Sequence, residues 1–321
     1  MGNGGPEMSD RRIRVGVVGV GALGQHHARV YAGLSDVLLV GVCDRDVDRG
    51  AEVARRHDCR AYPTVTELLP EVDALSVAVP TASHYEVACQ CLESGKDVLV
   101  EKPITETLDQ ADRLVALAGQ RRAVLQVGHV ERFNPAGEVL LREVREPRFI
   151  EVHRLGAFPA RSLDVDVVLD LMVHDLDMVL ALDGSEPVQV DAVGVAVLTP
   201  RIDIANARLR FASGLIANLT ASRVSTERVR KFRVFAAGGY VSVDFVGREA
   251  RVFRLVPGAE RPEIREEVFK GGDEEPLKRQ LEAFVSAVRT RSRPAVTGGD
   301  GRRALALALR IADSISMSSK G

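Results

Sequence analysis

The sequence predicts two domains, a doubly wound α/β domain with a parallel sheet and an α+β domain with a large, open antiparallel sheet. From Ile13 to about Gln126, short apolar segments alternate with amphipathic stretches, as a parallel sheet buried on both faces requires. After Gly128, apolar and polar residues alternate within each segment, and the gaps between segments are of hairpin size. This second pattern is typical of antiparallel strands with one apolar face.

The strands of the first domain are predicted by nearly unbroken apolar runs. In chain order these are "IRVGVVGVG", "VLLVGVCD", "DALSVAVP", "DVLVEKP" and "AVLQVGH". In the second domain we predict a helix around Val165–Leu182, and strands at "VDAVGVAVLT", "IANARLRF", "LIANLTAS", "RKFRVFAAG", "YVSVDF", "ARVFRLV" and "IREEVF". Two helices close the chain at Glu275–Thr290 and Gly301–Ser316, where apolar residues recur at helical spacing.

The length of the chain agrees with this division, since 321 residues are enough for two domains that each bury a core. The polar, glycine-rich start predicts a disordered tail at 1–11. The first domain is expected at 12–127 and the second at 128–321, with the last helix able to pack back on the first domain.

Charge and cysteine content exclude several classes of protein. The 43 basic and 45 acidic side chains nearly balance and form no long block, so we expect neither a nucleic-acid partner nor a membrane partner. The four cysteines lack zinc-binding spacing, which indicates reduced thiols and a cytoplasmic protein. No apolar run approaches the roughly 18 residues of a membrane span, and no signal peptide is expected.

A glycine motif lies between the first predicted strand and the next helix. Gly19, Gly21 and Gly24 form the pattern GxGxxG, and Ala22 and Leu23 complete the turn. In such a turn the first glycine permits the tight bend, the second lets a pyrophosphate approach the backbone, and the third allows close packing of helix and strand. The sequence therefore predicts a dinucleotide site; the alternative is an ordinary glycine-rich surface turn.

Asp44 ends the second predicted strand, where a carboxylate is able to bind the hydroxyls of the adenosine ribose. A carboxylate there repels a 2′-phosphate, so we expect NAD as the cofactor. Arg45 directly follows it and is suited to bind that phosphate, which leaves NADP as the alternative.

A second group of candidate residues follows two neighbouring predicted strands. The strand "DALSVAVP" ends at Pro80 and the chain turns through Thr81 to His84, while Glu101 and Lys102 lie at the end of the strand "DVLVEKP". Ligands of open α/β sheets lie outside the carboxyl ends of the strands, so these residues are predicted to bind the cofactor, with Lys102 where the nicotinamide rests. The alternative for Lys102 is a solvated lysine at a strand end.

The predicted helix of the second domain carries three ionisable residues within an apolar stretch. Asp170, His174 and Asp177 share one face at helical spacing, while Asp175 points elsewhere. A cleft that faces a nucleotide domain needs polar groups of this kind, so the stripe is a candidate part of an active site.

Three alternatives remain for this stripe. Its side chains are either satisfied within a core or subunit contact, or solvated, or ligands of a metal. His129 and His153 are distant from His174 in sequence, so no second histidine stands at ligand spacing and we expect no metal.

Together, the glycine turn, the EKP segment that contains Lys102 and the D-x-x-x-H-x-x-D helix resemble the Gfo/Idh/MocA family of NAD(P)-dependent sugar and cyclitol dehydrogenases. The resemblance covers nearly the whole chain from Ile13, in the right order. It implies a dinucleotide-binding Rossmann domain at 12–127. It also implies that 128–321 bind the substrate and assemble the protein into homodimers or homotetramers.

The resemblance further implies a catalytic set of Lys102, Asp170 and His174. Removing hydride from a carbinol requires a base for the hydroxyl proton, and imidazole has a suitable pKa, so His174 is the expected base. Lys102 is expected to stabilise the alkoxide or to relay the proton, and Asp170 to position the hydroxyl or Lys102. Met172 stands where many members of the family have glycine.

The segment "GHVERFNPA" (128–136) and the helix look most like the nucleotide-sugar branch of the family, the UDP-N-acetylglucosamine 3-dehydrogenases and enzymes that act on the uronate. This implies oxidation at C3 of UDP-N-acetylglucosamine or a close derivative, and a product that feeds an aminotransferase. The alternatives are a free sugar or inositol dehydrogenase of the same family and a non-catalytic NAD(P)-binding sensor.

Three further residues are candidates for substrate binding. The guanidinium of Arg132 suits a diphosphate and the amide of Asn134 suits a sugar hydroxyl. The alternative is that both merely cap a helix starting near Pro135. Arg161 is a second candidate for anion binding.

Overall fold

The fold is described from a computed structural model, which describes residues 11–158, 165–258, 261–272 and 274–318. The predicted tail, apart from its last residue, lies outside these ranges. The chain divides into two compact units, unit 1 (1–128 and 277–302) and unit 2 (129–276 and 303–321). No helix in the described ranges is long and apolar enough to cross a membrane.

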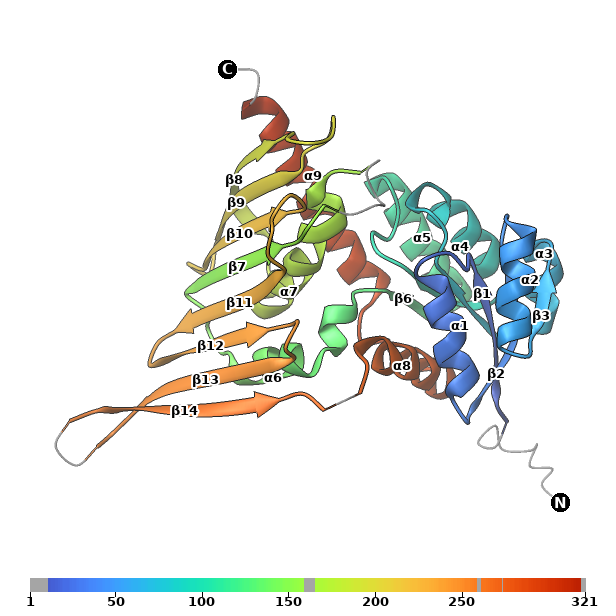
Figure 1. The fold of residues 1–321 in the computed structure, drawn as a ribbon, viewed down its shortest axis with the longest axis horizontal. Coiled ribbons are helices and arrows are strands. Elements are labelled where there is room, and N and C mark those ends of the chain that lie inside the picture. The colour runs from blue at the N-terminus through green and yellow to red at the C-terminus, as the bar shows by residue number, and fades with distance from the viewer. Residues whose placement is uncertain (1–10, 159–164, 259–260, 273, 319–321) are drawn as a thin grey trace. The chain divides into compact units, whose positions relative to one another are not determined.

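The core of unit 1 is a parallel sheet, as predicted, but it has six strands and not the five listed from the sequence, because the short edge strand at 60–62 was missed (Figure 1). The strand order is β3-β2-β1-β4-β5-β6. Successive strands are therefore added on one side of β1 up to β3 and on its other side from β4 onward. The carboxyl ends of the two central strands, β1 and β4, are where ligands of doubly wound sheets bind. The strands are β1 (Ile13–Val18), β2 (Val37–Cys43), β3 (Arg60–Tyr62), β4 (Ala74–Val77), β5 (Asp97–Val100) and β6 (Leu125–Val127).

Helices connect successive strands of this sheet. They are α1 (Gly24–Gly33), α2 (Val47–Arg56), α3 (Val65–Leu68), α4 (His84–Glu93) and α5 (Leu108–Arg121). A further helix, α8 (Pro276–Thr290), returns to unit 1 from the far end of the chain, whereas we expected the range 128–321 to form the second domain. The reason is apolar packing, because Leu281, Phe284 and Val285 of α8 belong to the same buried cluster as residues of β1 and α1.

Unit 2 is built on an eight-stranded sheet in the order β14-β13-β12-β11-β7-β10-β9-β8. All seven strands predicted after the helix are present: β8 (Pro187–Val195), β9 (Ile204–Phe211), β10 (Ile216–Ser222), β11 (Val229–Ala236), β12 (Gly239–Asp244), β13 (Glu249–Val256) and β14 (Glu263–Lys270). The sequence analysis missed a central strand, β7 (Phe149–Leu155). It pairs with β10 in parallel, so the sheet is mostly rather than wholly antiparallel.

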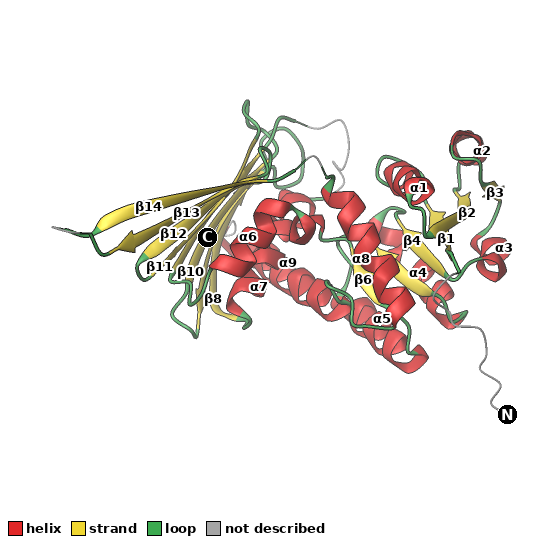
Figure 2. Ribbon diagram, turned by 90° about the horizontal axis from the view of Figure 1, so that it is seen from below, coloured by secondary structure: helices red, strands yellow, loops and turns green. Residues whose placement is uncertain are grey.

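Helices cover one face of this sheet (Figure 2). They are α6 (Pro135–Glu143), α7 (Val173–Asp183) and the part of α9 (Gly298–Ser318) that belongs to unit 2. On the opposite face an aromatic row crosses four neighbouring strands through directly paired positions. Its members are Phe149, Phe235, Tyr240 and Phe253, with ring centroids 4.3–5.9 Å apart.

Strand β14 forms one edge of the eight-stranded sheet. Its sequence EIREEVFK carries a charged side chain at most positions, and these charged residues are exposed or half-buried. Charged side chains on an edge strand discourage pairing with strands of other molecules.

Candidate active site

The glycine turn between β1 and α1 has the geometry that the sequence predicts. Gly19 has a φ of +81°, and a Cβ at Gly24 would lie 1.7 Å from the carbonyl oxygen of Gly19, so neither position accepts a side chain. A Cβ at Gly21 would meet nothing within 4 Å, which leaves the backbone there open to approach. Ala22 and Leu23 are exposed, and Leu23 provides no side-chain cap for α1. Uncapped amide groups beside open backbone suit a pyrophosphate.

Asp44 directly follows β2 and lies beside this turn. Its Oδ2 accepts the amide of Val20 at 2.7 Å, and its Oδ1 accepts the amide of Asp46 at 2.9 Å. Arg49 of α2 donates Nη2 to Oδ1 at 2.7 Å and Nε to Oδ2 at 3.2 Å. Burial alone would raise the pKa of Asp44, but these hydrogen bonds hold it below its usual range, so the carboxylate is ionised. The neighbouring candidate Arg45 is exposed.

The residues predicted after β4 differ in their surroundings. Pro80 is exposed and Thr81 half-buried, but His84 is 1% exposed. Its Nδ1 lies 2.8 Å from the carbonyl oxygen of Pro103, and its Nε2 lies 2.9 Å from that of Val79. Burial lowers the pKa of this imidazole, against the effect of the two carbonyl groups. His84 therefore joins the segment after β4 to the segment after β5.

Glu101 and Lys102 follow β5, and Glu101 is the more buried of the two. The Glu101 carboxylate lies 3.2 Å from Nε2 of His27 and accepts the backbone amide of Lys102 at 3.3 Å. Burial would raise the pKa of Glu101, but the hydrogen bond from His27 and nearby positive charge hold it below its usual value. Glu101 thus anchors the backbone from which the half-buried Lys102 projects.

The sequence analysis missed His27 and the constraint at Gly128. His27 lies three residues after Gly24 on α1 and is 1% exposed, so helical spacing placed it on the face that packs against the sheet. A Cβ at Gly128 would lie 2.5 Å from the Glu101 carboxylate, which explains the glycine at the end of β6.

The features of unit 1 fit a bound dinucleotide. Open backbone at Gly21 and an uncapped first turn of α1 suit the pyrophosphate, and the ionised Asp44 suits the ribose hydroxyls. All of them lie at the carboxyl edge of the sheet, directly after β1 and β2.

In unit 2, the helix predicted over 165–182 is not a single α-helix. It starts with a π-helical turn, η4 (Val168–Met172), and continues as α7. Asp166 caps the start, since its Oδ1 accepts the amides of Val168 and Leu169 at 3.0 and 2.9 Å. π-helical turns inside helices are frequent at functional sites.

The acidic and imidazole stripe divides into an accessible part and a buried part. Asp170 in η4 and His174 in α7 are half-buried, whereas Asp177 is 1% exposed. Arg132 donates Nε to Oδ2 of Asp177 at 2.6 Å and Nη2 to Oδ1 at 2.8 Å. Asp177 is therefore held in an ion pair, and Asp170 and His174 are the accessible members of the stripe.

Asp175 points away from this stripe, as predicted, and joins a buried charge network. Arg154 of β7 donates Nε and Nη2 to its two carboxylate oxygens at 2.7 and 2.8 Å. A third donor of Arg154, Nη1, reaches Glu131 at 3.1 Å, and none of the three side chains is more than 7% exposed. The sequence analysis missed Arg154 and Glu131, because nothing local to either residue marks its distant partner.

His129 lies beside His174, although the two are far apart in sequence. Their ring centroids are 6.3 Å apart, and the ring planes meet at 89°, edge to face. The sequence analysis took the separation along the chain to mean that His129 is not a neighbour of His174, and that expectation is wrong. Within the described ranges, no three His, Cys, Asp or Glu side chains are grouped so that they could hold a metal ion.

Asn134 serves as the cap that the sequence analysis gave as an alternative. Its Oδ1 accepts the amide of Ala136 at 3.1 Å at the start of α6. Its Nδ2 donates to Glu131 and to the carbonyl oxygen of Phe245, at 3.2 and 3.3 Å. These contacts occupy the amide within the protein. Arg161, the remaining candidate, lies outside the described residues.

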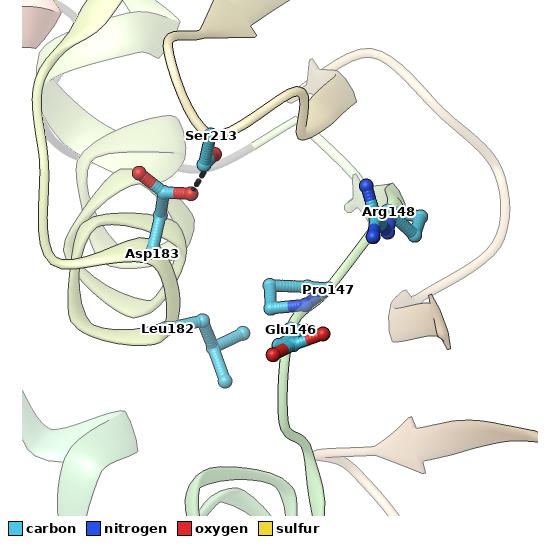
Figure 3. Close-up of a pocket in the computed structure, with 6 residues that line it drawn as sticks. All are labelled: Glu146, Pro147, Arg148, Leu182, Asp183 and Ser213. Carbon is cyan, nitrogen blue, oxygen red and sulfur yellow. Dashed lines mark hydrogen bonds between the residues drawn. The ribbon is translucent and has the colours of Figure 1, made fainter. Parts of the chain in front are cut away.

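A separate hollow of 440 Å³ opens on unit 2 (Figure 3). It is lined by Glu146, Pro147, Arg148, Leu182, Asp183 and Ser213. Asp183 is the last residue of α7, and Asp170 precedes it by about 20 Å of helix at roughly 1.5 Å per residue. The hollow includes none of the predicted site residues and is not the candidate active site.

Comparison with known families covers most of the chain. Residues 13–129 match a model described as an oxidoreductase family with an NAD-binding Rossmann fold. Residues 142–242 match the GFO/IDH/MocA C-terminal domain.

Named relatives are similar over nearly the full length. The chain is 42% identical over 304 residues to UDP-N-acetylglucosamine 3-dehydrogenase of Acidithiobacillus ferrooxidans, which covers 93% of this chain and 96% of that protein. It is 26% identical over 313 residues to an inositol 2-dehydrogenase of Rhizobium meliloti, which covers 92% and 94%. A solved structure of the Acidithiobacillus enzyme superposes with a TM-score of 0.90 at 41% identity, over 95% of this chain and 97% of that one.

Proposed function

This chain belongs to the GFO/IDH/MocA family of NAD-binding oxidoreductases, and on that premise we propose that it oxidises the C3 hydroxyl of UDP-N-acetylglucosamine, or a close derivative, to the 3-keto sugar. The observation that carries the proposal is the 42% identity, over 93% of this chain, to an enzyme named for that substrate and position. The inositol dehydrogenase of Rhizobium meliloti is a more distant relative at 26% identity.

Oxidation of a secondary alcohol removes a hydride from carbon and a proton from oxygen. When bound, NAD supplies the hydride acceptor, C4 of its nicotinamide ring. The protein has to supply a base within hydrogen-bond reach of the hydroxyl. We assign this role to His174, because imidazole titrates near neutral pH and this side chain lies in the accessible part of the stripe.

Two further residues complete the proposed catalytic set. Lys102 stabilises the negative charge that develops on the oxygen as the proton leaves, and Asp170 holds the hydroxyl or the lysine in position. Each of these two residues is held in position by neighbouring residues of its own unit. Glu101 fixes the backbone at Lys102, and the π-helical turn η4 presents Asp170 one helical turn before His174.

The test is a substrate panel with the purified protein and NAD. UDP-N-acetylglucosamine, its uronate, free N-acetylglucosamine, glucose and myo-inositol are compared by the absorbance of NADH. Turnover of the nucleotide sugars alone is expected, with a product that lacks two hydrogens and carries its carbonyl at C3 by NMR. Faster turnover of myo-inositol or free sugars would contradict the proposal. Tight NADH binding without turnover of any compound would indicate a sensor.

The proposal extends to location and partners. The four cysteines are free thiols, which agrees with a location in the cytoplasm. An aminotransferase is the expected consumer of a 3-keto sugar.

The aromatic row on the open face of the sheet supports assembly into a homodimer or homotetramer. Light scattering after size-exclusion chromatography tests this assembly, and Phe253→Glu is expected to lower the measured mass.

A further inference from the structure

The carboxylate of Asp44 has its acceptor positions filled by donors of the protein itself. An ionised carboxylate offers about four acceptor positions. Asp44 accepts the amides of Val20 and Asp46 and two N–H groups of Arg49, at 2.7–3.2 Å. The ribose hydroxyls of NAD need acceptor positions on this same group. Binding of NAD at Asp44 therefore requires one of these donors to leave.

Arg49 is the donor that is free to move. The amides of Val20 and Asp46 belong to the glycine turn and to the N-cap of α2, so the fold holds them in place. The Arg49 side chain is 45% exposed, and its second contact, to Asp46 at 3.3 Å, is with a side chain that is 49% exposed. The Asp44 carboxylate itself is only 5% exposed, but water reaches the arginine end of the pair, so breaking the contact is expected to reduce NAD affinity by a factor of roughly 1.4 to 5.

We propose that Arg49 sets the balance between NAD and NADP in this protein. It competes with the ribose hydroxyls of NAD for Asp44, and it neutralises the charge by which Asp44 repels the 2′-phosphate of NADP. The guanidinium also presents two parallel N–H donors, the arrangement that binds a phosphate in bidentate fashion. The inference rests on the NAD-binding assignment of unit 1 and is independent of the sugar that the protein oxidises.

Arg45 is the competing candidate for the 2′-phosphate, since the sequence analysis assigned that contact to it, and its variant tests the two arginines against each other. It directly follows Asp44 and is exposed and positively charged, as Arg49 is, but the donors to the Asp44 carboxylate come from Val20, Asp46 and Arg49. Arg45→Gln and Arg49→Gln each remove one positive charge from the same surface. A difference between the two variants therefore reports the contact with Asp44 and not the net charge.

The experiment titrates both variants and the parent protein with NADH and NADPH, followed by cofactor fluorescence, with no sugar present. For Arg49→Gln we expect NADH to bind roughly 1.4 to 5 times more tightly. We expect the ratio of the NADPH to the NADH dissociation constant to rise at least about tenfold, because a charge-assisted contact to the phosphate is lost. Arg45→Gln should change this ratio less than about threefold.

Three results would overturn the proposal: an unchanged ratio in Arg49→Gln, weaker NADH binding in that variant, or a larger change in Arg45→Gln. Circular dichroism and the thermal midpoint establish that the variants are folded. If Arg49→Gln fails to fold, Arg49→Lys replaces it, since lysine keeps the charge but not the paired donors. The lysine variant is then expected to raise the ratio, and a ratio equal to that of the parent protein refutes the role of Arg49. Because no sugar is present, an error in the substrate assignment leaves these results unaffected.

Discussion

Arg132 donates to both carboxylate oxygens of Asp177, at 2.6 and 2.8 Å, and so ties the turn after β6 to the middle of α7. A single peptide stretch, η3 (Val130–Phe133), carries both Arg132 and Glu131, and Glu131 contacts Arg154. Two buried ion-pair systems therefore hold α7 from different sides. The rotation of α7 that presents His174 depends on both.

Replacement of the proposed base should slow turnover strongly without preventing cofactor binding. We expect His174→Ala to lower kcat by roughly 10²- to 10⁴-fold with UDP-N-acetylglucosamine, because the hydroxyl proton loses its acceptor. Lys102→Ala should lower it comparably. His153→Ala is the control, since that histidine is 47% exposed on the sheet. A kcat for His174→Ala within threefold of the parent value, measured alongside NADH titration, would remove His174 from the mechanism.

Replacement of the buried Arg154 should lower the free energy of unfolding more than replacement of an exposed arginine. Arg154→Leu leaves Asp175 and Glu131 without their shared buried partner and should lower the free energy of unfolding by about 3–5 kcal/mol. Arg233→Leu breaks the ion pair with Glu151, where both side chains are at least 34% exposed, and should cost less than about 1 kcal/mol. Urea unfolding measures both. Equal losses in the two variants would show that the buried network contributes no more to stability than an exposed ion pair.

The glycine turn allows a paired test on one helix. Gly24→Ala places a Cβ 1.7 Å from the Gly19 carbonyl oxygen, so we expect NADH affinity to fall at least about tenfold and stability to fall by roughly 1–3 kcal/mol. Gly33→Ala, at the other end of α1, meets nothing within 4 Å and should stabilise by about 0.4–1 kcal/mol. Fluorescence titration and thermal unfolding distinguish the two. Normal NADH binding by Gly24→Ala would argue against this turn as the phosphate site.

The stability of unit 2 should fall in acid through Asp203. Burial would raise the pKa of this carboxyl, but hydrogen bonds from the amides of Thr199 and Leu198 and from Arg223 hold it well below its usual range. The unfolded state then binds the proton more readily, so stability is full above about pH 4 and declines as pH falls further. Asp203→Asn should be less stable at pH 7 and should flatten the decline. Urea midpoints between pH 2 and 7 test this, and parallel curves for both proteins would refute it.

Local signals were sufficient for much of the site. The spacing of Gly19, Gly21 and Gly24 after the first apolar run indicates a turn that requires glycine at its first and last positions. The position of Asp44 follows in the same way from the end of the second apolar run. Asn134 before a proline is a local capping signal, and the structure uses it in that way. Each of these features depends only on residues nearby in the sequence and can therefore be predicted without knowledge of the fold.

The remaining features depend on contacts between distant segments. Arg132 pairs with Asp177 and His129 lies beside His174 only because the segment 129–133 and α7 are brought together, and no local pattern records that. Helix α8 was predicted to within one residue of its observed start but was expected in the second domain, since amphipathic spacing shows that a face is buried and not what buries it. The missed strand β7 lies near the centre of the sheet. Its alternating pattern is short and gives only a weak local signal, and the strand is held by its pairing with β10 and β11.

The charged edge strand β14 bears on how this protein behaves when it is concentrated. A sheet that ends in an unprotected strand can add copies of itself indefinitely and polymerise, whereas the glutamates, arginine and lysine of EIREEVFK oppose such growth. Ionic strength screens this protection over a distance of about 8 Å at physiological salt and about 3 Å at 1 M. We therefore expect concentrated samples of this protein to aggregate or form fibres at a lower protein concentration in 1 M salt than in a buffer of low ionic strength.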